Sequence, residues 1–186
     1  PGGSVVEVGS KVTHLKVGDR VALEPGITCG KCEFCKTGRY NLCPDVVFFA
    51  TPPVDGVFQE YVAHPADLCF KLPENISTLE GALIEPLAVG FHAANQGEAT
   101  AGQTAIVFGA GCIGLVSMMA LFVKGLSKVY VVDIVQKRLD KALELGATGV
   151  INASVQDVVK TAMELTGGKG FDLAIETTGA EKCTVD

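Results

Sequence analysis

The sequence predicts an α/β protein in which a β-rich part precedes a doubly wound parallel sheet. Short strand-like segments separated by turn residues fill the chain up to about residue 73. Beyond Gly102, apolar strand-like segments alternate with helical segments of about ten residues, which is the pattern of consecutive βαβ units. Because the pattern changes between residues 76 and 100, we expect two domains, residues 1–85 and residues 86–186.

Four segments of the first part have strand character. Residues 56–62 alternate apolar and polar side chains, as a strand with one buried face does. Gly18 and Asp19 form a turn ahead of the second segment, and Pro73 ends the fourth. The four predicted strands are residues 5–8, 20–23, 56–62 and 69–72.

Helix signals mark the junction between the two parts. Ser77 and Glu80 have the spacing of a capping box. Glu85 and Pro86 precede a helical run over residues 87–95, with the proline near the first turn. The βαβ part then predicts strands over 104–108, 128–132, 149–151 and 171–175, and helices over 112–124, 135–145 and 155–165.

Composition excludes several classes of partner. Apolar residues make up 48% of the chain and charged residues 19%, which is enough apolar material for a packed core. Lys and Arg number 15 against 21 Asp and Glu, so a net charge of −6 argues against nucleic acid and anionic membranes. The apolar run 113–123 is too short to span a bilayer. We expect no signal peptide, because no basic segment followed by an apolar one opens the chain. Because the chain does not begin with Met and its last residues follow a strand and turn without a closing element, we interpret it as an internal piece of a longer cytoplasmic protein.

Four of the seven cysteines lie close together in a polar loop. Cys29, Cys32, Cys35 and Cys43 fall within fifteen residues, and the other three are scattered. Four thiolates suit a tetrahedral zinc ion, and a full set of four leaves no open position for catalysis. An iron–sulfur cluster is the alternative because Pro44 follows the last cysteine, but the bacterial ferredoxin spacing has three residues before that cysteine, not seven. We therefore expect a structural zinc over residues 29–43 in a reducing compartment.

A glycine-rich turn follows the predicted strand 104–108 and opens a predicted helix. Gly109 would allow the tight turn, Gly111 the close approach of a pyrophosphate, and Gly114 the close packing of helix on strand. The neighbouring Cys112 and Ile113 would present the N–H groups of the helix N-terminus to the phosphates. We expect the Cys112 side chain itself to fill a small apolar space rather than to take part in redox chemistry.

An acidic residue ends the next predicted strand. Asp133 lies nineteen residues after Gly114, close to the roughly 20 expected for an acid that binds the ribose hydroxyls. Its negative charge would repel a 2′-phosphate, so the sequence predicts NAD rather than NADP as the cofactor. Arg138, one turn into the following helix, would flank the adenine or simply be solvated. The alternative for the whole motif is an ordinary glycine turn with Asp133 capping the next helix.

Taken together, these motifs resemble the zinc-containing medium-chain dehydrogenase/reductase family. Residues 48–56 (FFATPPVDG) and 80–93 (EGALIEPLAVGFHA) are similar to its polyol (sorbitol/xylitol) dehydrogenase branch. The resemblance covers essentially the whole chain. It implies a partial GroES-like catalytic domain over residues 1–85 and a partial Rossmann NAD-binding domain over 86–186.

The resemblance also implies a reaction and site residues. A secondary alcohol of a sugar alcohol would be oxidised to the ketose by hydride transfer to NAD, with a catalytic zinc as Lewis acid. Glu85 would act at that zinc as ligand or through water, and the other ligands of the family lie upstream of Pro1. Phe48 and Phe49 would line the substrate cleft. From its position alone, Glu85 would be only a charge near a helix N-terminus.

Two alternatives remain open at this stage. One is another zinc dehydrogenase of the same family, such as a threonine or butanediol dehydrogenase. The other is a zinc- and nucleotide-binding piece without turnover. The resemblance further implies a homo-oligomer, a tetramer or dimer, when the protein is intact.

Overall fold

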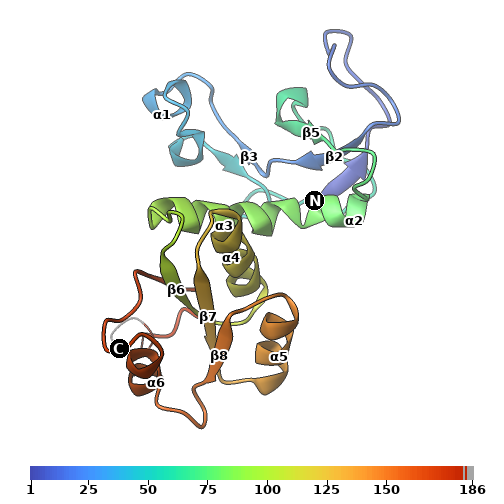
Figure 1. Ribbon diagram of the computed structural model, residues 1–186. Helices are drawn as coiled ribbons and strands as arrows, with labels where there is room; N and C mark the ends of the chain where they lie inside the picture. The colour runs from blue at the N-terminus through green and yellow to red at the C-terminus, as the bar shows by residue number, and fades with distance from the viewer. Residues whose placement is uncertain (182, 184–186) are drawn as a thin grey trace. The chain divides into compact units, whose positions relative to one another are not determined.

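The computed structural model describes residues 1–181 and 183 (Figure 1). The chain divides into two compact units, Pro1–Glu85 and Pro86–Asp186. We refer to them as unit 1 and unit 2. No helix in the described part of the chain has both the length and the apolar character that a membrane crossing needs.

Unit 1 contains two small antiparallel sheets. In the first, β2 is the central strand, and Val21 lies opposite Gly3 of β1 and opposite Lys71 of β5. The second sheet pairs β3 with β4, with Gly26 opposite Phe48. The strands are β1 (Gly2–Ser4), β2 (Arg20–Leu23), β3 (Gly26–Ile27), β4 (Val47–Phe48) and β5 (Cys69–Lys71), and the helices are α1 (Glu33–Lys36), α2 (Thr78–Ala82), η1 (Tyr40–Leu42) and η2 (Ala66–Leu68).

Two of the strands predicted in this unit are wrong. The first strand is β1 rather than residues 5–8, and residues 56–62 form bends and irregular backbone without a strand. Val5 still exchanges backbone hydrogen bonds with Gly18 and Asp19, but no bond of this kind to residues 6–8 occurs within the described residues. An alternating pattern makes a segment suitable for a strand, yet a strand forms only where a neighbouring backbone pairs with it.

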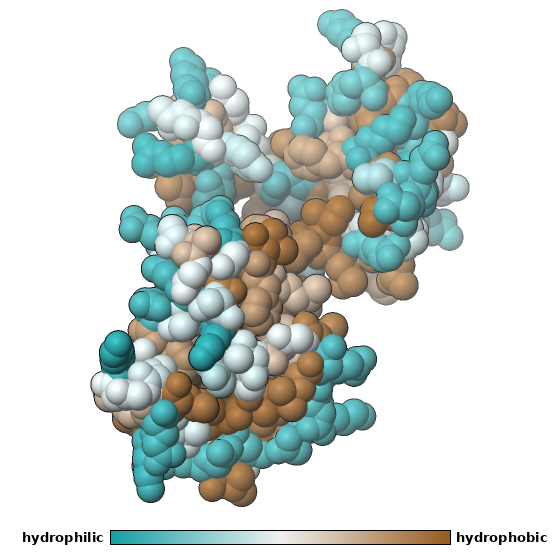
Figure 2. Space-filling view, viewed as in Figure 1, coloured by the Kyte–Doolittle hydropathy of each residue, from teal (hydrophilic) through white to brown (hydrophobic). Residues whose placement is uncertain are grey.

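The two unpaired segments line one apolar groove of about 870 Å³ within unit 1. Residues 4–9 contribute to its lining on one stretch of chain, and residues 60–64 contribute on another. Val6 and Tyr61 are 62% and 71% exposed, so their apolar surface is not covered within this unit. Figure 2 shows such apolar side chains among hydrophilic ones on the viewed face of both units.

The predicted helix signals at the junction are confirmed. Ser77 caps α2 by accepting a hydrogen bond from the Glu80 N–H, and the Glu80 carboxylate accepts one from the Ser77 N–H in return. The following helix, α3 (Ile84–Gln96), begins three residues earlier than predicted and contains Pro86 in its first turn. A proline is tolerated there because the first helical N–H groups have no partner within the helix.

Unit 2 is built on a four-stranded parallel sheet in the order β8-β7-β6-β9. The chain runs from β6 outward to β8 and then returns to the other side of β6 with β9, so β6 and β9 flank the topological switch point. Its elements are β6 (Thr104–Phe108), α4 (Cys112–Val123), β7 (Lys128–Asp133), α5 (Gln136–Glu144), β8 (Gly149–Asn152), α6 (Val158–Leu165) and β9 (Leu173–Glu176).

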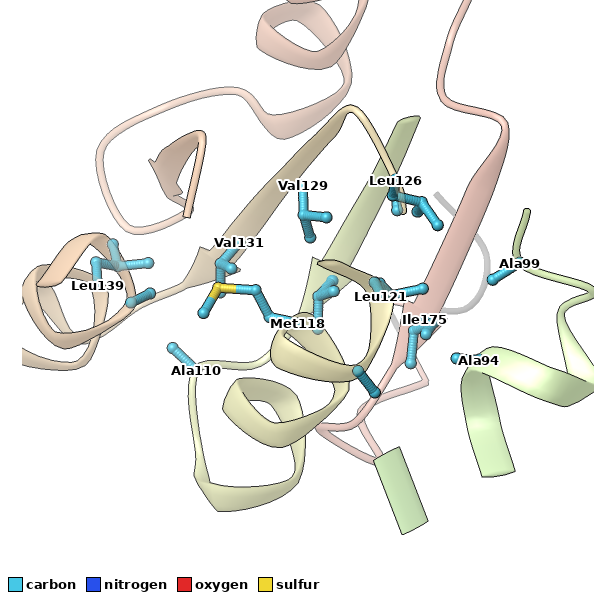
Figure 3. Packing of buried hydrophobic residues seen from close by; sticks show 14 residues of the cluster. Ala94, Ala99, Ala110, Met118, Leu121, Leu126, Val129, Val131, Leu139 and Ile175 are labelled. Atoms are coloured by element: carbon cyan, nitrogen blue, oxygen red, sulfur yellow. The ribbon is translucent and has the colours of Figure 1, made fainter. Parts of the chain in front are cut away.

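Apolar side chains cover both faces of this sheet. One face packs against residues of α3, α4 and α5, and Figure 3 shows Met118 and Leu121 of α4 in this cluster with Val131 and Ile175 of the sheet. The other face carries a smaller cluster of Ile106, Val132 and Ile151, against which side chains of α6 pack. Helices on both faces of a parallel sheet confirm the predicted doubly wound fold.

Candidate zinc and dinucleotide sites

The four clustered cysteines converge in unit 1. Their sulfur atoms all lie within 4.8 Å of one another, although Cys35 lies in α1 and η1 separates it from Cys43 in the sequence. The Sγ atoms of Cys29 and Cys35 are 4.0 Å apart, and those of Cys32 and Cys35 are 3.5 Å apart. Cys43 is buried and the other three are half-buried, so the cluster is largely shielded from water.

Backbone N–H groups point at these sulfur atoms. The N–H groups of Cys32, Cys35 and Cys29 lie 3.4–3.5 Å from the Sγ atoms of Cys29, Cys32 and Cys43 respectively. Hydrogen bonds from the backbone of Lys31 and Cys32 lower the pKa of Cys29 to about 7. The Cys35 N–H also lowers the pKa of Cys32, but burial and the neighbouring thiols outweigh it and raise that pKa to about 11 in the metal-free cluster. Such backbone donors stabilise thiolates, which are the form of cysteine that binds a metal.

The geometry fits a tetrahedral zinc ion. With Zn–S bonds of about 2.3 Å, tetrahedral sulfur atoms lie roughly 3.8 Å apart, which matches the observed separations. Four sulfur ligands complete the coordination, so such an ion would stabilise the loop rather than bind substrate. Among the described residues, this is the one group of three or more His, Cys, Asp or Glu side chains close enough to share a metal ion.

The glycine-rich turn of unit 2 needs two of its glycines for its own folding. Gly109 has φ +100°, which side chains with a Cβ rarely adopt. A Cβ added to Gly114 would lie 1.8 Å from the Gly109 carbonyl oxygen, so α4 can approach the end of β6 only with glycine at this position. These two residues therefore determine the shape of the turn.

Gly111 differs from its two neighbours in the motif. A Cβ added to it would meet nothing within 4 Å, and its φ of −77° suits any residue. Gly111 is the N-cap of α4 and offers no side chain to the N–H groups of the first turn, which include those of Cys112, Ile113 and Gly114. The turn thus leaves free space beside unpaired N–H donors, which is what a bound phosphate requires.

Asp133 is held against this turn. Its carboxylate accepts hydrogen bonds from the N–H of Ala110 and the N–H of Val135, each at 2.8 Å. An Nη1 atom of Arg138 lies 3.9 Å from the same carboxylate, and the arginine side chain is 59% exposed. The structure therefore brings Asp133, Arg138 and the glycine turn together, as the spacing in the sequence predicts.

The expectation that the Cys112 side chain fills an apolar space is wrong. Cys112 is exposed at the first position of α4, whereas its neighbour Ile113 is half-buried. Within the first turn of α4, one side is therefore exposed at Cys112 and the other is covered at Ile113 and Gly114. Cys112 can reach a ligand at the turn only through its backbone N–H.

The remaining predicted site residues lie in unit 1 and at its end. Phe48 is exposed in β4, and the half-buried Phe49 ring packs on His64 with ring centroids 5.1 Å apart. Glu85 is exposed in the first turn of α3, and its carboxylate has no hydrogen bond or ion pair within the described residues. The structure thus leaves both predicted roles untested.

Sequence reasoning did not single out His64 or Thr177. Both ring nitrogens of His64 are buried without a partner among the described residues, and burial lowers the pKa of this imidazole. Thr177 directly follows β9 and contacts the glycine turn. The strand β9 ends beside β6, which leads into the glycine turn. Once this strand order is known, the position of Thr177 directly after β9 indicates that it lies near the turn.

Comparison with protein families assigns both units. Residues 2–74 match the family described as "Alcohol dehydrogenase GroES-like domain", and residues 112–185 match the one described as "Zinc-binding dehydrogenase". Each of the two parts belongs to a domain family of the zinc-binding alcohol dehydrogenases. This confirms the predicted resemblance and the two-part fold.

Relatives of this chain include proteins named for polyol chemistry. The sorbitol dehydrogenase of Bacillus subtilis is 47% identical over 177 residues, which are 95% of this chain and 50% of that protein. The Aspergillus terreus protein named "Probable D-xylulose reductase A" is 47% identical over 183 residues, which are 96% of this chain and 52% of that protein. The chain therefore spans about half the length of the curated relatives it matches.

Solved structures share the fold at similar coverage. An Escherichia coli oxidoreductase of unknown specificity superposes with a TM-score of 0.95 at 44% identity, over 98% of this chain and 53% of that one. The 2R,3R-butanediol dehydrogenase of Bacillus subtilis superposes with a TM-score of 0.86 at 41% identity, over 98% of this chain and 51% of that one.

Two further structures contain a nucleotide. A Sinorhizobium meliloti zinc-binding dehydrogenase bound to NADP gives a TM-score of 0.91 at 33% identity, over 98% of this chain and 54% of that one. An Escherichia coli alcohol dehydrogenase complexed with NADH superposes with a TM-score of 0.87 at 33% identity, over 96% of this chain and 52% of that one. The fold is therefore shared by structures with either nucleotide.

Proposed function

We propose that this chain is part of a zinc-dependent, NAD-linked polyol dehydrogenase. Unit 2 would bind NAD, and unit 1 would supply a structural zinc site and part of the substrate site. The observation that carries the proposal is the arrangement of Asp133 beside a glycine turn whose Gly111 leaves open space.

The chain's own residues have distinct parts in binding NAD. The N–H groups of the first turn of α4 would donate to the diphosphate, in the space beside Gly111. The Asp133 carboxylate uses one lone pair on each oxygen for Ala110 and Val135, so it retains lone pairs for the ribose hydroxyls. With that carboxylate fixed, a 2′-phosphate would meet a negative charge, which supports NAD over NADP.

Zinc would act in two places in the intact enzyme. Cys29, Cys32, Cys35 and Cys43 would hold the structural ion, and a second, catalytic ion would supply Lewis-acid chemistry at the substrate hydroxyl. Glu85 would orient water or a proton-bearing group at that second site, and its exposed, unpaired carboxylate is free to do so. Phe48 and Phe49 would exclude water from the substrate cleft.

Names of relatives support sugar alcohols as the substrates. Sorbitol dehydrogenase and D-xylulose reductase, both 47% identical, act on polyol–ketose pairs by name. The butanediol dehydrogenase at 41% identity favours vicinal diols as the second candidate. Both candidates are small secondary alcohols. We further propose a homo-oligomer, a tetramer or dimer, in the cytoplasm.

The cofactor proposal is tested by titrating the zinc-loaded chain with NADH and NADPH and following nucleotide fluorescence. We expect NADH to bind at least about tenfold more tightly, a difference of about 1.4 kcal/mol. Asp133→Asn should reduce this preference because it removes the repelling charge. The matched control is Asp157→Asn, since Asp157 caps α6 by accepting from the Lys160 N–H and does not adjoin the turn. Equal or tighter binding of NADPH by the unaltered chain would refute the assignment.

The substrate proposal requires the full-length protein. Its kcat/KM should be higher for sorbitol and xylitol than for threonine and 2,3-butanediol. Glu85→Gln should lower turnover about 10²-fold or more while leaving NADH affinity and structural zinc unchanged. Preference for butanediol would favour the second candidate, and full activity of Glu85→Gln would remove Glu85 from the site.

A further inference from the structure

Thr177 links β9 to β6, the strand that leads into the glycine turn, by hydrogen bonds. It follows β9 directly, and both its N–H and its Oγ1 donate to the Phe108 carbonyl oxygen, at 2.9 Å and 2.7 Å. Phe108 is the last residue of β6, and Gly109 comes next. The backbone bond continues the β6–β9 ladder, but the side-chain bond is specific to a hydroxyl residue at this position.

The same hydroxyl is in contact with the glycines of the turn. A Cβ added to Gly109 would lie 2.5 Å from Thr177 Oγ1, and one added to Gly114 would lie 3.0 Å from it. The hydroxyl therefore occupies the space between the start of the turn and the start of α4. Few positions in unit 2 could affect the shape of the turn so directly.

The segment around Thr177 is itself held in place. The Glu176 carboxylate accepts hydrogen bonds from the N–H and the hydroxyl of Thr178 and from the N–H of Gly179. These bonds close a short turn beyond β9, so the Thr177 side chain is presented from a fixed backbone. A rigid support is what a residue needs if it is to hold another segment in place.

We infer that Thr177 is a positioning residue of the dinucleotide site, which holds the glycine turn in its binding shape through the Phe108 carbonyl. The inference rests on the proposed NAD site and adds a residue outside the glycine motif. Thr177 acts through the turn and does not itself need to contact the nucleotide. Loss of its hydroxyl should therefore weaken NADH binding without unfolding unit 2.

The test compares Thr177→Val with Thr177→Ser in the zinc-loaded chain. Valine keeps the shape but lacks the donor, whereas serine keeps the donor. We expect the Kd for NADH to rise about tenfold in Thr177→Val and to stay within about twofold of the unaltered chain in Thr177→Ser, since tenfold corresponds to about 1.4 kcal/mol.

A matched control separates this effect from a general loss of stability. Thr166 is also half-buried, and its Oγ1 donates to the Ala162 carbonyl at 2.8 Å at the end of α6. Thr166→Val should lower the Tm about as much as Thr177→Val but leave the Kd for NADH unchanged. An equal loss of affinity in Thr166→Val, or in Thr177→Ser, would overturn the inference.

A second readout does not depend on nucleotide binding. In the free protein, amide hydrogen exchange at Gly109 and Ala110 should be faster in Thr177→Val and normal in Thr177→Ser. Unchanged exchange in Thr177→Val would refute the positioning role even if NADH binding were weakened. If the unaltered chain does not bind NADH, the proposed function fails, while the exchange experiment still decides whether Thr177 holds the turn.

Discussion

The two units of this chain differ in the interactions that stabilise them. Unit 2 buries a continuous apolar cluster between its sheet and α3, α4 and α5, and a second cluster on the opposite face. In the described part of unit 1, few apolar side chains are buried: Leu15, Val21, Ala22, Cys43 and Leu72. Its longest strand has four residues. We infer that unit 1 depends on cross-linking by a metal ion where unit 2 depends on apolar burial.

The same contrast separates the two ligand sites. The cysteine site needs four side chains from a loop of irregular structure, and its geometry exists only when that loop is folded. The nucleotide site needs mainly backbone N–H groups and the absence of side chains at three glycines. Substitution of a cysteine of the four-cysteine cluster should therefore affect the stability of unit 1 alone. Substitution of a glycine of the turn should affect unit 2 alone.

The largest effect should follow from removing one cysteine ligand. Cys32→Ser should abolish stoichiometric zinc binding and lower the Tm of unit 1 by more than about 10 °C, because structural zinc contributes directly to folding. Zinc content by atomic absorption and unfolding by calorimetry would measure this.

Cys69→Ser is the matched control, because Cys69 is a half-buried thiol outside the cluster. It should keep both zinc and NADH binding, and NADH affinity should also survive in Cys32→Ser. Full zinc retention in Cys32→Ser would contradict the four-sulfur site.

A second prediction distinguishes glycines that serve folding from those that serve binding. Gly114→Ala should destabilise unit 2 by about 3 kcal/mol, since the new Cβ would lie 1.8 Å from a backbone oxygen. Gly111→Ala should leave stability within about 0.5 kcal/mol but raise the Kd for NADH at least about tenfold, because the methyl group fills the open space. Urea unfolding and NADH titration measure the two effects. Unimpaired NADH binding by Gly111→Ala would place the diphosphate elsewhere.

The smallest effect concerns a carboxylate of unit 1 and its dependence on pH. The buried Asp19 side chain accepts from Lys71 Nζ at 2.8 Å and from the Lys16 N–H at 3.0 Å, and these bonds, that of Lys71 first, lower its pKa. A carboxyl group whose pKa is lower in the folded state stabilises the protein above the ordinary pKa of about 3.9 and loses that contribution as the pH falls through the lowered value.

Asp19→Asn should therefore lower the Tm slightly at pH 6, and the difference should vanish toward pH 2–3. Thermal unfolding across this pH range is the measurement. The exposed Asp67→Asn variant is the control and should show no such trend. A difference that persisted at low pH would mean that lost packing, not charge, causes the effect.

The sequence alone determined most of unit 2 and which residues lie together at the two candidate sites. Strands and helices of a βαβ unit alternate along the chain, and each helix packs on strands close to it in sequence, so apolar periodicity is a sufficient guide. The glycine motif, Asp133 and the cysteine cluster are likewise recognisable because their chemistry lies in residue type and spacing. The capping box at Ser77 and Glu80 is local in the same way.

The tertiary structure decided what depends on partners far away in the sequence. The alternating residues 56–62 form no strand because no described backbone pairs with them, and Cys112 is exposed because it lies on the side of α4 that the described residues leave uncovered. Thr177 lies 69 residues from Phe108, and only the strand order places its hydroxyl at the glycine turn. A sequence pattern indicates which secondary structure a segment can form. Whether the segment pairs as a strand, or whether a side chain is covered, depends on which distant segment packs beside it.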